Sequence, residues 1–258
     1  MSSMEPPVVK RRGRFCLGKK PPLVDRRTLQ FMAYVRPELP APPAAVNYGK
    51  AVTHWPVYAN DRYGDCTCAA AGHMIQGWRT NTNQSPRKPS TQEIVEFYSY
   101  FTTPSPTNGV EMLRVLRHWR STGLAGDRIH AYAQLRLKNV DEVKQSIYLF
   151  GACYIGVTFP KFITNAEDKL TVHWSVPPQG THGEGAPDPD GGHCIPAFAY
   201  DDSHLYVVTW GAVKAMTWSF YLAYADEAYA VLSTDWLKDG RTPKGFDFNQ
   251  LRTDLHAL

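Results

Sequence analysis

Cys66 and His193 are the two residues whose types and surroundings could support covalent chemistry. Cys66 follows the turn-forming segment NDRYGD and begins a run of small residues that predicts a helix over 66–81. A thiol at the start of a helix lies at the positive end of the helix dipole, which favours the thiolate and lowers the pKa of the cysteine. His193 follows DGG at the start of a predicted strand, and the two glycines leave space for a group to approach the imidazole. Together the two side chains could serve as a nucleophile and its general base.

Other common catalytic and cofactor motifs do not occur. The sequence has no G-x-S-x-G, no G-x-x-x-x-G-K-[ST], no G-x-G-x-x-G between a strand and a helix, and no H-E-x-x-H. Cys66, Cys68 and His73 could be grouped with His193 and Cys194 as a metal site, but neither spacing is that of a zinc knuckle. We therefore predict no metal and no cofactor, and place Cys68 in the core.

The elements that must position this pair change character along the chain. Helical periodicity or capping signals predict further helices over 90–101, 109–123 and 139–151. Short β-branched and aromatic runs bounded by Gly, Pro and Asp predict strands over 152–160, 193–202, 204–211 and 227–233. Helices followed by strands within one domain indicate the α+β class.

The chain divides into three predicted parts. Residues 1–45 form a basic, proline-rich arm, residues 46–235 a single domain, and residues 236–258 an extension with a short helix. The arm is expected to be flexible or to lie over the domain as a strap. The alternatives are a tether to an acidic partner and a pro-segment, and the former is disfavoured because the basic charge does not continue beyond Arg36.

Composition excludes several classes of protein. The 258 residues carry 28 Lys and Arg against 24 Asp and Glu, and the resulting net charge of +4 is small for a dedicated nucleic-acid binder. No apolar run reaches the 18 or so residues that span a membrane, and the first fifteen residues lack the apolar core of a secretion signal. We expect five free cysteines in a reducing compartment, and a cytoplasmic or virion-associated protein.

Several segments resemble papain-like cysteine peptidases. LPAPPAAVNYGKAVTHWPVYANDRYGDCTCAA is similar to the region that leads into the nucleophile of that family, GGHCIPAFAYDD to its histidine strand, and VVTWG to its Asn-Ser-Trp-Gly segment. VDEVKQSIYLFGACYIGVTF is similar to the helix and strand that precede the histidine. The resemblance covers 40–235 in order, with a Cys-to-His separation just under the roughly 130–150 residues typical of papain-type chains. The patterns GDCT and TWGA also resemble bacterial and phage proteins.

The resemblance implies a papain-like fold and a role for each matched residue. An N-terminal helical lobe, with its central helix starting at Cys66, would pack on a C-terminal antiparallel β-sheet lobe. Cys66 matches the nucleophile and His193 the base. Asn60 stands where the family has a glutamine that binds the oxyanion, and its side chain reaches about 1.5 Å less. The backbone N–H of Cys66 would be the second donor. Trp210 would lie beside the imidazole and shield it from water.

The residue that orients the histidine is where the sequence departs from the family. Val208 occupies the position of the family's asparagine and cannot form a hydrogen bond. Thr209 could replace it only if the strand contained a bulge, because strand alternation turns Val208 and Trp210 to one face and Thr209 to the other. We therefore expect His193 to bond a water, a backbone carbonyl or no residue. The sulfur of Cys66 is expected within about 3–5 Å of a ring nitrogen of His193.

Two functions follow from the resemblance. The first is a thiol hydrolase that acts on peptide, isopeptide or related amide bonds, with a peptide or protein as substrate. The alternative is a catalytically impaired papain-like module that binds or assembles, for example in a phage particle. Val208 and the basic arm, which could contact an acidic partner, motivate this alternative. Membrane and nucleic-acid partners are not expected.

Overall fold

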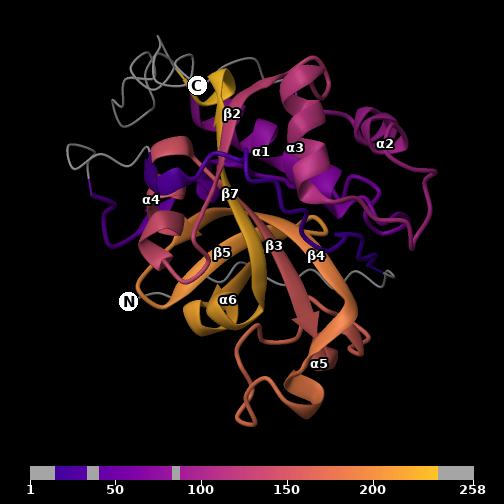
Figure 1. Cartoon of the computed structure of the whole chain (residues 1–258), viewed down its shortest axis with the longest axis vertical. Helices are drawn as coiled ribbons and strands as arrows, with labels where there is room; N and C mark the ends of the chain where they lie inside the picture. The colour runs from indigo at the N-terminus through magenta and orange to yellow at the C-terminus, as the bar shows by residue number, and fades with distance from the viewer. Residues whose placement is uncertain (1–14, 34–40, 83–87, 238–258) are drawn as a thin grey trace.

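The structure, a computed structural model of the whole chain, describes residues 15–33, 41–82 and 88–237. Helices α1, α2 and α3 gather on one side of the molecule, and a twisted antiparallel sheet runs beside and below them (Figure 1). The α+β class predicted from the sequence is confirmed, and so is the helix that begins at Cys66. Two predictions concern residues outside the described ranges: the arm at 1–14 and 34–40, and the terminal helix within 236–258 apart from Trp236 and Leu237.

Most predicted helices and strands are present, with shifts of a few residues at their ends. The helices are α1 (Cys66–Thr82), α2 (Thr91–Ser99), α3 (Met112–Ser121), α4 (Val140–Phe150), α5 (Lys161–Thr164) and α6 (Trp218–Tyr224). The strands are β1 (Val46–Asn47), β2 (Ile129–Gln134), β3 (Cys153–Pro160), β4 (Pro187–Tyr200), β5 (His204–Thr209), β6 (Ala212–Thr217) and β7 (Ala225–Ser233). The short elements β1 and α5, and also β2, β6 and α6, were not predicted from the sequence.

The sheet runs in the order β2-β7-β3-β4-β5-β6, and β1 pairs with β4 off this path. All the named strand pairs are antiparallel. Strand β3 lies between β4 and β7, so that Gly156 is paired with Cys194 on one side and Glu227 on the other. This row of three residues places the strand that carries His193 two strands away from the beginning of β7.

Helix α1 is buried on nearly all sides, which explains its small residues. The run from Cys66 to Gly77 is buried throughout. A Cβ at Gly77 would overlap the aromatic ring of Phe198 on β4, and a Cβ at Gly72 would meet the tip of Ile94 on α2 at 2.6 Å. The helix therefore packs closely between the sheet and α2, and its N-terminus is fixed relative to β4.

The ends of the neighbouring helices are formed as their sequences predict. Ser90 and Glu93 form a capping box at the start of α2, in which Ser90 N–H donates to the Glu93 carboxylate at 2.8 Å. Asn139 accepts hydrogen bonds at the start of α4, and Gly151 ends that helix in the left-handed conformation at φ +79°. A side chain at Gly151 would also collide with the Trp236 ring. No helix in the described ranges has both the length and the apolar character needed to cross a membrane.

The close contact between α1 and β4 gives a testable difference between two glycines. Alanine is favoured over glycine in a helix by roughly 1 kcal/mol. Gly77→Ala should nevertheless lower the free energy of unfolding by about 1–3 kcal/mol, because the buried Phe198 ring must move. Gly72→Ala is the matched control, since its closest contact is the flexible end of Ile94, and the Tyr58 ring lies farther off at 3.1 Å. Urea unfolding of both variants measures the difference, and equal stability would contradict this account of the packing.

Candidate active site

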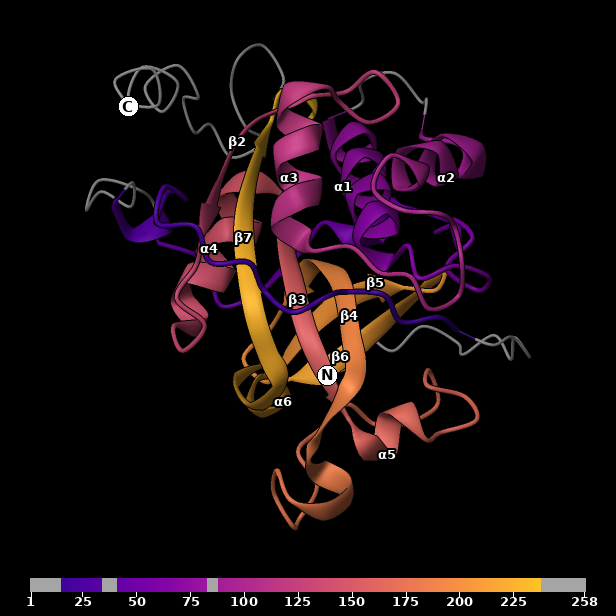
Figure 2. The ribbon, with the colours of Figure 1, turned by 45° about the vertical axis from the view of Figure 1, so that its right-hand side comes forward.

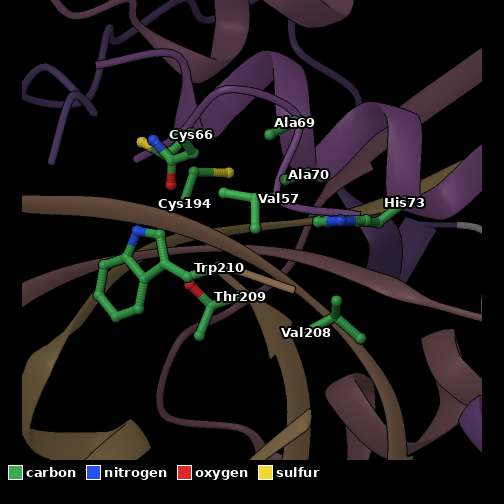
Figure 3. A pocket seen from close by; sticks show the side chains of 10 residues that line it. Val57, Cys66, Ala69, Ala70, His73, Cys194, Val208, Thr209 and Trp210 are labelled. Carbon is green, nitrogen blue, oxygen red and sulfur yellow. The ribbon is translucent and has the colours of Figure 1, made fainter. Parts of the chain in front are cut away.

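Cys66 is the first residue of α1, and its thiol is buried at the contact between the helix and β4. Its side chain lies in a pocket with Cys194, Thr209 and Trp210, and Figure 3 shows the two cysteines on one side and Thr209 with Trp210 on the other. Burial raises the pKa of Cys66 to about 12, although hydrogen bonds from the N–H groups of Cys194 and Gly18 act in the opposite direction. The expectation of a lowered pKa is wrong for this closed arrangement, because loss of hydration outweighs the helix terminus.

His193 lies on β4 and is held between aromatic rings. The Trp210 ring stacks on the imidazole with centroids 4.4 Å apart and an interplanar angle of 20°, and the Phe159 ring lies at 5.4 Å. Burial, with the positive charges of Lys169 and Lys19, lowers the pKa of His193 to about 3. The predicted position of Trp210 beside His193 is confirmed, and the imidazole is neutral in this environment.

Thr209, and not a water or a carbonyl, is the hydrogen-bond partner of His193. Its Oγ1 lies 2.7 Å from Nε2 of the imidazole in a buried contact. The expectation that Thr209 faces away was wrong because alternation stops at the end of β5. Trp210 (φ +47°) and Gly211 (φ +76°) form the two-residue turn that joins Thr209 to Ala212 on β6.

The left-handed conformation of Trp210 is the structural exception that makes this contact possible. Non-glycine residues reach such φ values at a cost of about 1–2 kcal/mol. The turn brings the Trp210 ring and the Thr209 hydroxyl to the same imidazole, whereas a continued strand would separate them. Nδ1 of His193 is buried and accepts or donates no hydrogen bond within the described residues. The imidazole is thus fixed at one nitrogen and unpartnered at the other.

Asn60 lines the same pocket as Cys66, but its amide is already engaged. Nδ2 donates to the carbonyl of Tyr63 at 3.0 Å and to the carbonyl of Cys16 at 3.3 Å. The indole Nε1 of Trp210 donates to the same Cys16 carbonyl, also at 3.3 Å. Two side-chain donors therefore converge on one peptide carbonyl that comes from the N-terminal part of the chain.

That carbonyl belongs to a segment that runs through the site, residues 15–20, here called the N-terminal strap. Figure 2 shows the indigo trace of residues 15–33, which includes this strap, crossing in front of β4, β3 and β7, below α3. The Phe15 ring stacks on Trp210 at 4.8 Å, and the N–H of Cys16 donates to the carbonyl of Asn60 at 2.9 Å. Further along, the N–H of Gly18 donates to the carbonyl of Gly192 at 3.1 Å.

Glycines on both sides make room for the strap. A Cβ at Gly18 would overlap the carbonyl oxygen of Gly64, and a Cβ at Gly192 would overlap the carbonyl oxygen of Lys19. The glycines before His193 are predicted from the sequence to admit an approaching group, and in this structure the group is the strap backbone. With the strap in place, the exposed fractions of Cys66 and His193 are each only 1%.

The remaining predicted groups are structural. Cys68 is fully buried, as expected for the core, and all five cysteines of the chain are free thiols. Within the described ranges, no three His, Cys, Asp or Glu side chains come together in a way that could hold a metal ion. His73, which also lines the pocket, bonds the Pro56 carbonyl through Nε2 at 2.7 Å. Asp65 next to the nucleophile position is fully buried, and burial raises its pKa.

Comparison with solved structures identifies the class of fold. Xylellain, a cysteine protease from Xylella fastidiosa, is similar with a TM-score of 0.63 and 16% identity, over 88% of this chain and 99% of the other. Procathepsin B S9 from Trypanosoma congolense gives a TM-score of 0.56 at 10% identity, over 85% and 87% of the two chains. The Carica candamarcensis cysteine protease CMS1MS2, in complex with E-64, gives 0.51 at 13%, over 74% and 99%.

The chain therefore has the fold of papain-like cysteine proteases, as its sequence predicted. Because all these identities are low, the similarity establishes the fold alone. Neither a scan against protein-family models nor a search of curated proteins gives a match.

The buried histidines give a testable pH dependence. Burial lowers the pKa of His73 to about 4, so its stabilising contribution is complete above its ordinary value near 6.5 and is lost as the pH falls toward 4. Between pH 7.5 and pH 5, His73 should account for a loss of about 2 kcal/mol in the free energy of unfolding.

His73→Gln keeps a donor for the Pro56 carbonyl and removes this titration. Urea unfolding at both pH values should show a drop about 2 kcal/mol smaller for the variant than for the wild type. The comparison cancels the opposite contribution of Glu227, whose pKa burial raises to about 7. His182→Gln is the control, since His182 is exposed. An unchanged drop in the His73 variant would show that this imidazole is not buried in its neutral form.

Proposed function

We propose that this protein is a thiol hydrolase that cleaves peptide or related amide bonds with Cys66 as nucleophile and His193 as general base. The observation that carries the proposal is the state of the imidazole. Nε2 is fixed by Thr209 at 2.7 Å, Nδ1 has no hydrogen-bond partner within the described residues, and the N–H of the next residue, Cys194, points to the Cys66 sulfur. An imidazole that donates through Nε2 presents the Nδ1 lone pair as a base.

The chemical steps follow from these groups. Nδ1 takes the proton of the Cys66 thiol, and the sulfur attacks the carbonyl carbon of the substrate. The backbone N–H of Cys66, at the start of α1, and the amide of Asn60 stabilise the oxyanion. The imidazolium returns the proton to the leaving amine, and water then hydrolyses the thioester. That Asn60 already binds a peptide carbonyl, the one of Cys16, supports its role as a carbonyl donor.

The N-terminal strap must leave before a substrate can enter. Its backbone lies against Gly64 and Gly192, and the Phe15 ring covers the face of Trp210. The closed form keeps Cys66 as a neutral thiol, since burial is the main cause of its raised pKa. When the strap lifts, water reaches the sulfur and the helix terminus favours the thiolate. We infer that the strap controls access to the nucleophile.

A second function is favoured by the strap itself. A cleft filled by the protein's own chain suits a non-catalytic module that exposes a binding surface when the strap is displaced, for example in an assembly such as a phage particle. The basic residues of the arm could bring an acidic partner to that surface. Under this alternative, Cys66→Ala leaves the biological function intact, whereas deletion of the arm destroys it.

Unseating the strap in the full-length chain tests the proposed hydrolase. Gly18→Ala places a methyl group against the Gly64 carbonyl and should lift the strap without changing a catalytic group. Iodoacetamide at mildly acidic pH should then modify Cys66 about 10-fold faster than in the wild type, and faster than the other four cysteines. Hydrolysis of a broad peptide library should rise in parallel and vanish in Gly18→Ala/Cys66→Ala.

Two further variants make this test specific. Lys20→Ala is the matched control, because that side chain is exposed on the same strap. Adding His193→Ala to Gly18→Ala should abolish the selective labelling of Cys66. Uniform labelling of exposed thiols with no hydrolysis after Gly18→Ala would favour the binding module instead.

Thr209 is proposed as a positioning residue, and its hydroxyl can be removed at constant shape. Thr209→Val in the Gly18→Ala background should lower kcat by about 10-fold or more with a small change in KM, because the imidazole is no longer held in one orientation. Thr209→Ser should restore most of the rate, and the pH profile of kcat/KM should shift in the valine variant alone. An unaltered profile and rate in Thr209→Val would exclude this role.

A further inference from the structure

Lys19 of the strap is buried in a manner that ordinary packing does not require. Its side chain is 1% exposed, and Nζ lies 2.9 Å from Oδ2 of Asp226 and 3.6 Å from Oε1 of Glu227. Nζ also donates to the carbonyl of Lys20 at 3.2 Å. Burying a charged amine is costly unless opposite charges meet it, and an apolar residue would cover a cleft at lower cost. The buried lysine is therefore best explained by a chemical property of the pocket that holds it.

That property is a pair of carboxylates on β7 that the rest of the domain only partly satisfies. Asp226 accepts a hydrogen bond from Thr158 at 2.7 Å, and Glu227 accepts one from Tyr229 at 2.9 Å. Within the described residues, Oδ1 of Asp226 and Oε1 of Glu227 are buried and have no hydrogen-bond partner. The Glu227 side chain is fully buried. Without a cation at this place, the pocket would hold two poorly compensated carboxylates.

The shape of the pocket fits a long, unbranched stem. A Cβ at Gly156 would lie 2.8 Å from Cδ of Lys19, from Cγ of Glu227 and from Sδ of Met112. Gly156 thus leaves the space through which the lysine stem passes, and Met112 forms a wall of that space. The charged head then reaches the carboxylates at the far end.

The pocket is also close to the proposed nucleophile. Gly156 pairs with Cys194 on β4 and with Glu227 on β7, so the backbone of Glu227 lies two strand spacings, about 10 Å, from that of the residue that follows His193. The N–H of Lys19 donates to the carbonyl of Gly192 at 3.0 Å, which is the residue before His193. A peptide bound along the same edge would place one side chain in this pocket and a neighbouring peptide bond near Cys66.

We propose that the pocket formed by Met112, Gly156, Asp226 and Glu227 is a specificity subsite for a lysine or arginine side chain of the substrate, and that Lys19 occupies it in the closed form. This rests on the proposed function and narrows its substrates to extended peptides with a basic residue close to the cleaved bond. Lys19 then helps to cover the site, and its side chain occupies the subsite in the same way as the basic side chain of a substrate.

The test measures binding apart from hydrolysis. The full-length Gly18→Ala/Cys66→Ala protein is titrated with fluorescent hexapeptides from a positional library, in which one position is lysine, arginine or norleucine. Norleucine keeps the apolar stem and removes the charge. At one position, the basic peptides should bind about 10-fold or more tightly than the norleucine peptide, as expected for a hydrogen-bonded charge in a buried site. Equal binding at all positions overturns the proposal.

Variants of the pocket provide the second measurement. Asp226→Asn/Glu227→Gln keeps the volume of both side chains and should abolish the preference for lysine. Asp188→Asn, which alters a carboxylate on β4 outside the pocket, is the matched control and should retain it. If the double variant does not fold, the comparison of peptides on the unaltered pocket still decides the question. A retained preference in a folded double variant counts against these carboxylates.

The outcomes separate the subsite from the hydrolase. A preference for basic peptides without hydrolysis by Gly18→Ala would support the subsite and contradict the proposed activity. Hydrolysis of the library without any preference for a basic residue would do the reverse. Lys19→Met should, in addition, increase alkylation of Cys66 relative to Lys20→Met, because the strap loses its ion pairs.

Discussion

The close packing of α1 against β4 is the constraint on which the site depends. Small residues let the helix approach the strand, with Gly77 against Phe198 toward one end and Cys66 against Cys194 at the other. Because a helix and a strand are both stiff, fixing this contact fixes the thiol relative to the residue that follows His193. The rest of the sheet then presents the groups that surround the pair, with Thr209 and Trp210 on one side and the β7 carboxylates on the other.

The turn after β5 brings Thr209 and Trp210 to the same side of His193, which a regular strand could not do. A strand that continued past Thr209 would turn the indole and the hydroxyl to opposite faces. The left-handed Trp210 breaks this alternation, so that one imidazole is stacked by the indole and bonded by the hydroxyl. Local backbone strain is tolerated here because stacking and hydrogen bonding around the ring determine its position.

Prediction from the sequence worked where the signal is local. Capping residues such as Ser90 and Asn139 mark their helices, and Cys66 could be placed at a helix start because a turn-forming segment precedes a run of small residues. The partner of His193 could not be found in this way, since Trp-Gly is not a usual pair for a turn with two positive φ values. The packing of the strap depends on gaps at Gly64 and Gly192, which are far away in the chain.

The pKa of the Cys66 thiol likewise could not be predicted from the local sequence. A helix terminus is a local feature and predicts a lowered pKa, whereas burial is a property of everything that packs around the sulfur. Here the strap completes that burial, and the pKa rises to about 12. The pKa of a buried ionisable group thus depends on the segments that cover it. The local sequence alone predicts the pKa that the group would have without that cover.

The strap is covalently attached to the domain that it covers, and this has a kinetic consequence. A tethered ligand competes at an effective concentration that does not fall when the protein is diluted, and that reaches the millimolar range for short linkers. Under the proposed function, a free peptide competes with Phe15 and Lys19 at that constant concentration. Closure by the strap is therefore intramolecular and does not depend on the concentration of the protein. The strap would be released by a change in the chain itself or by another molecule that binds the strap.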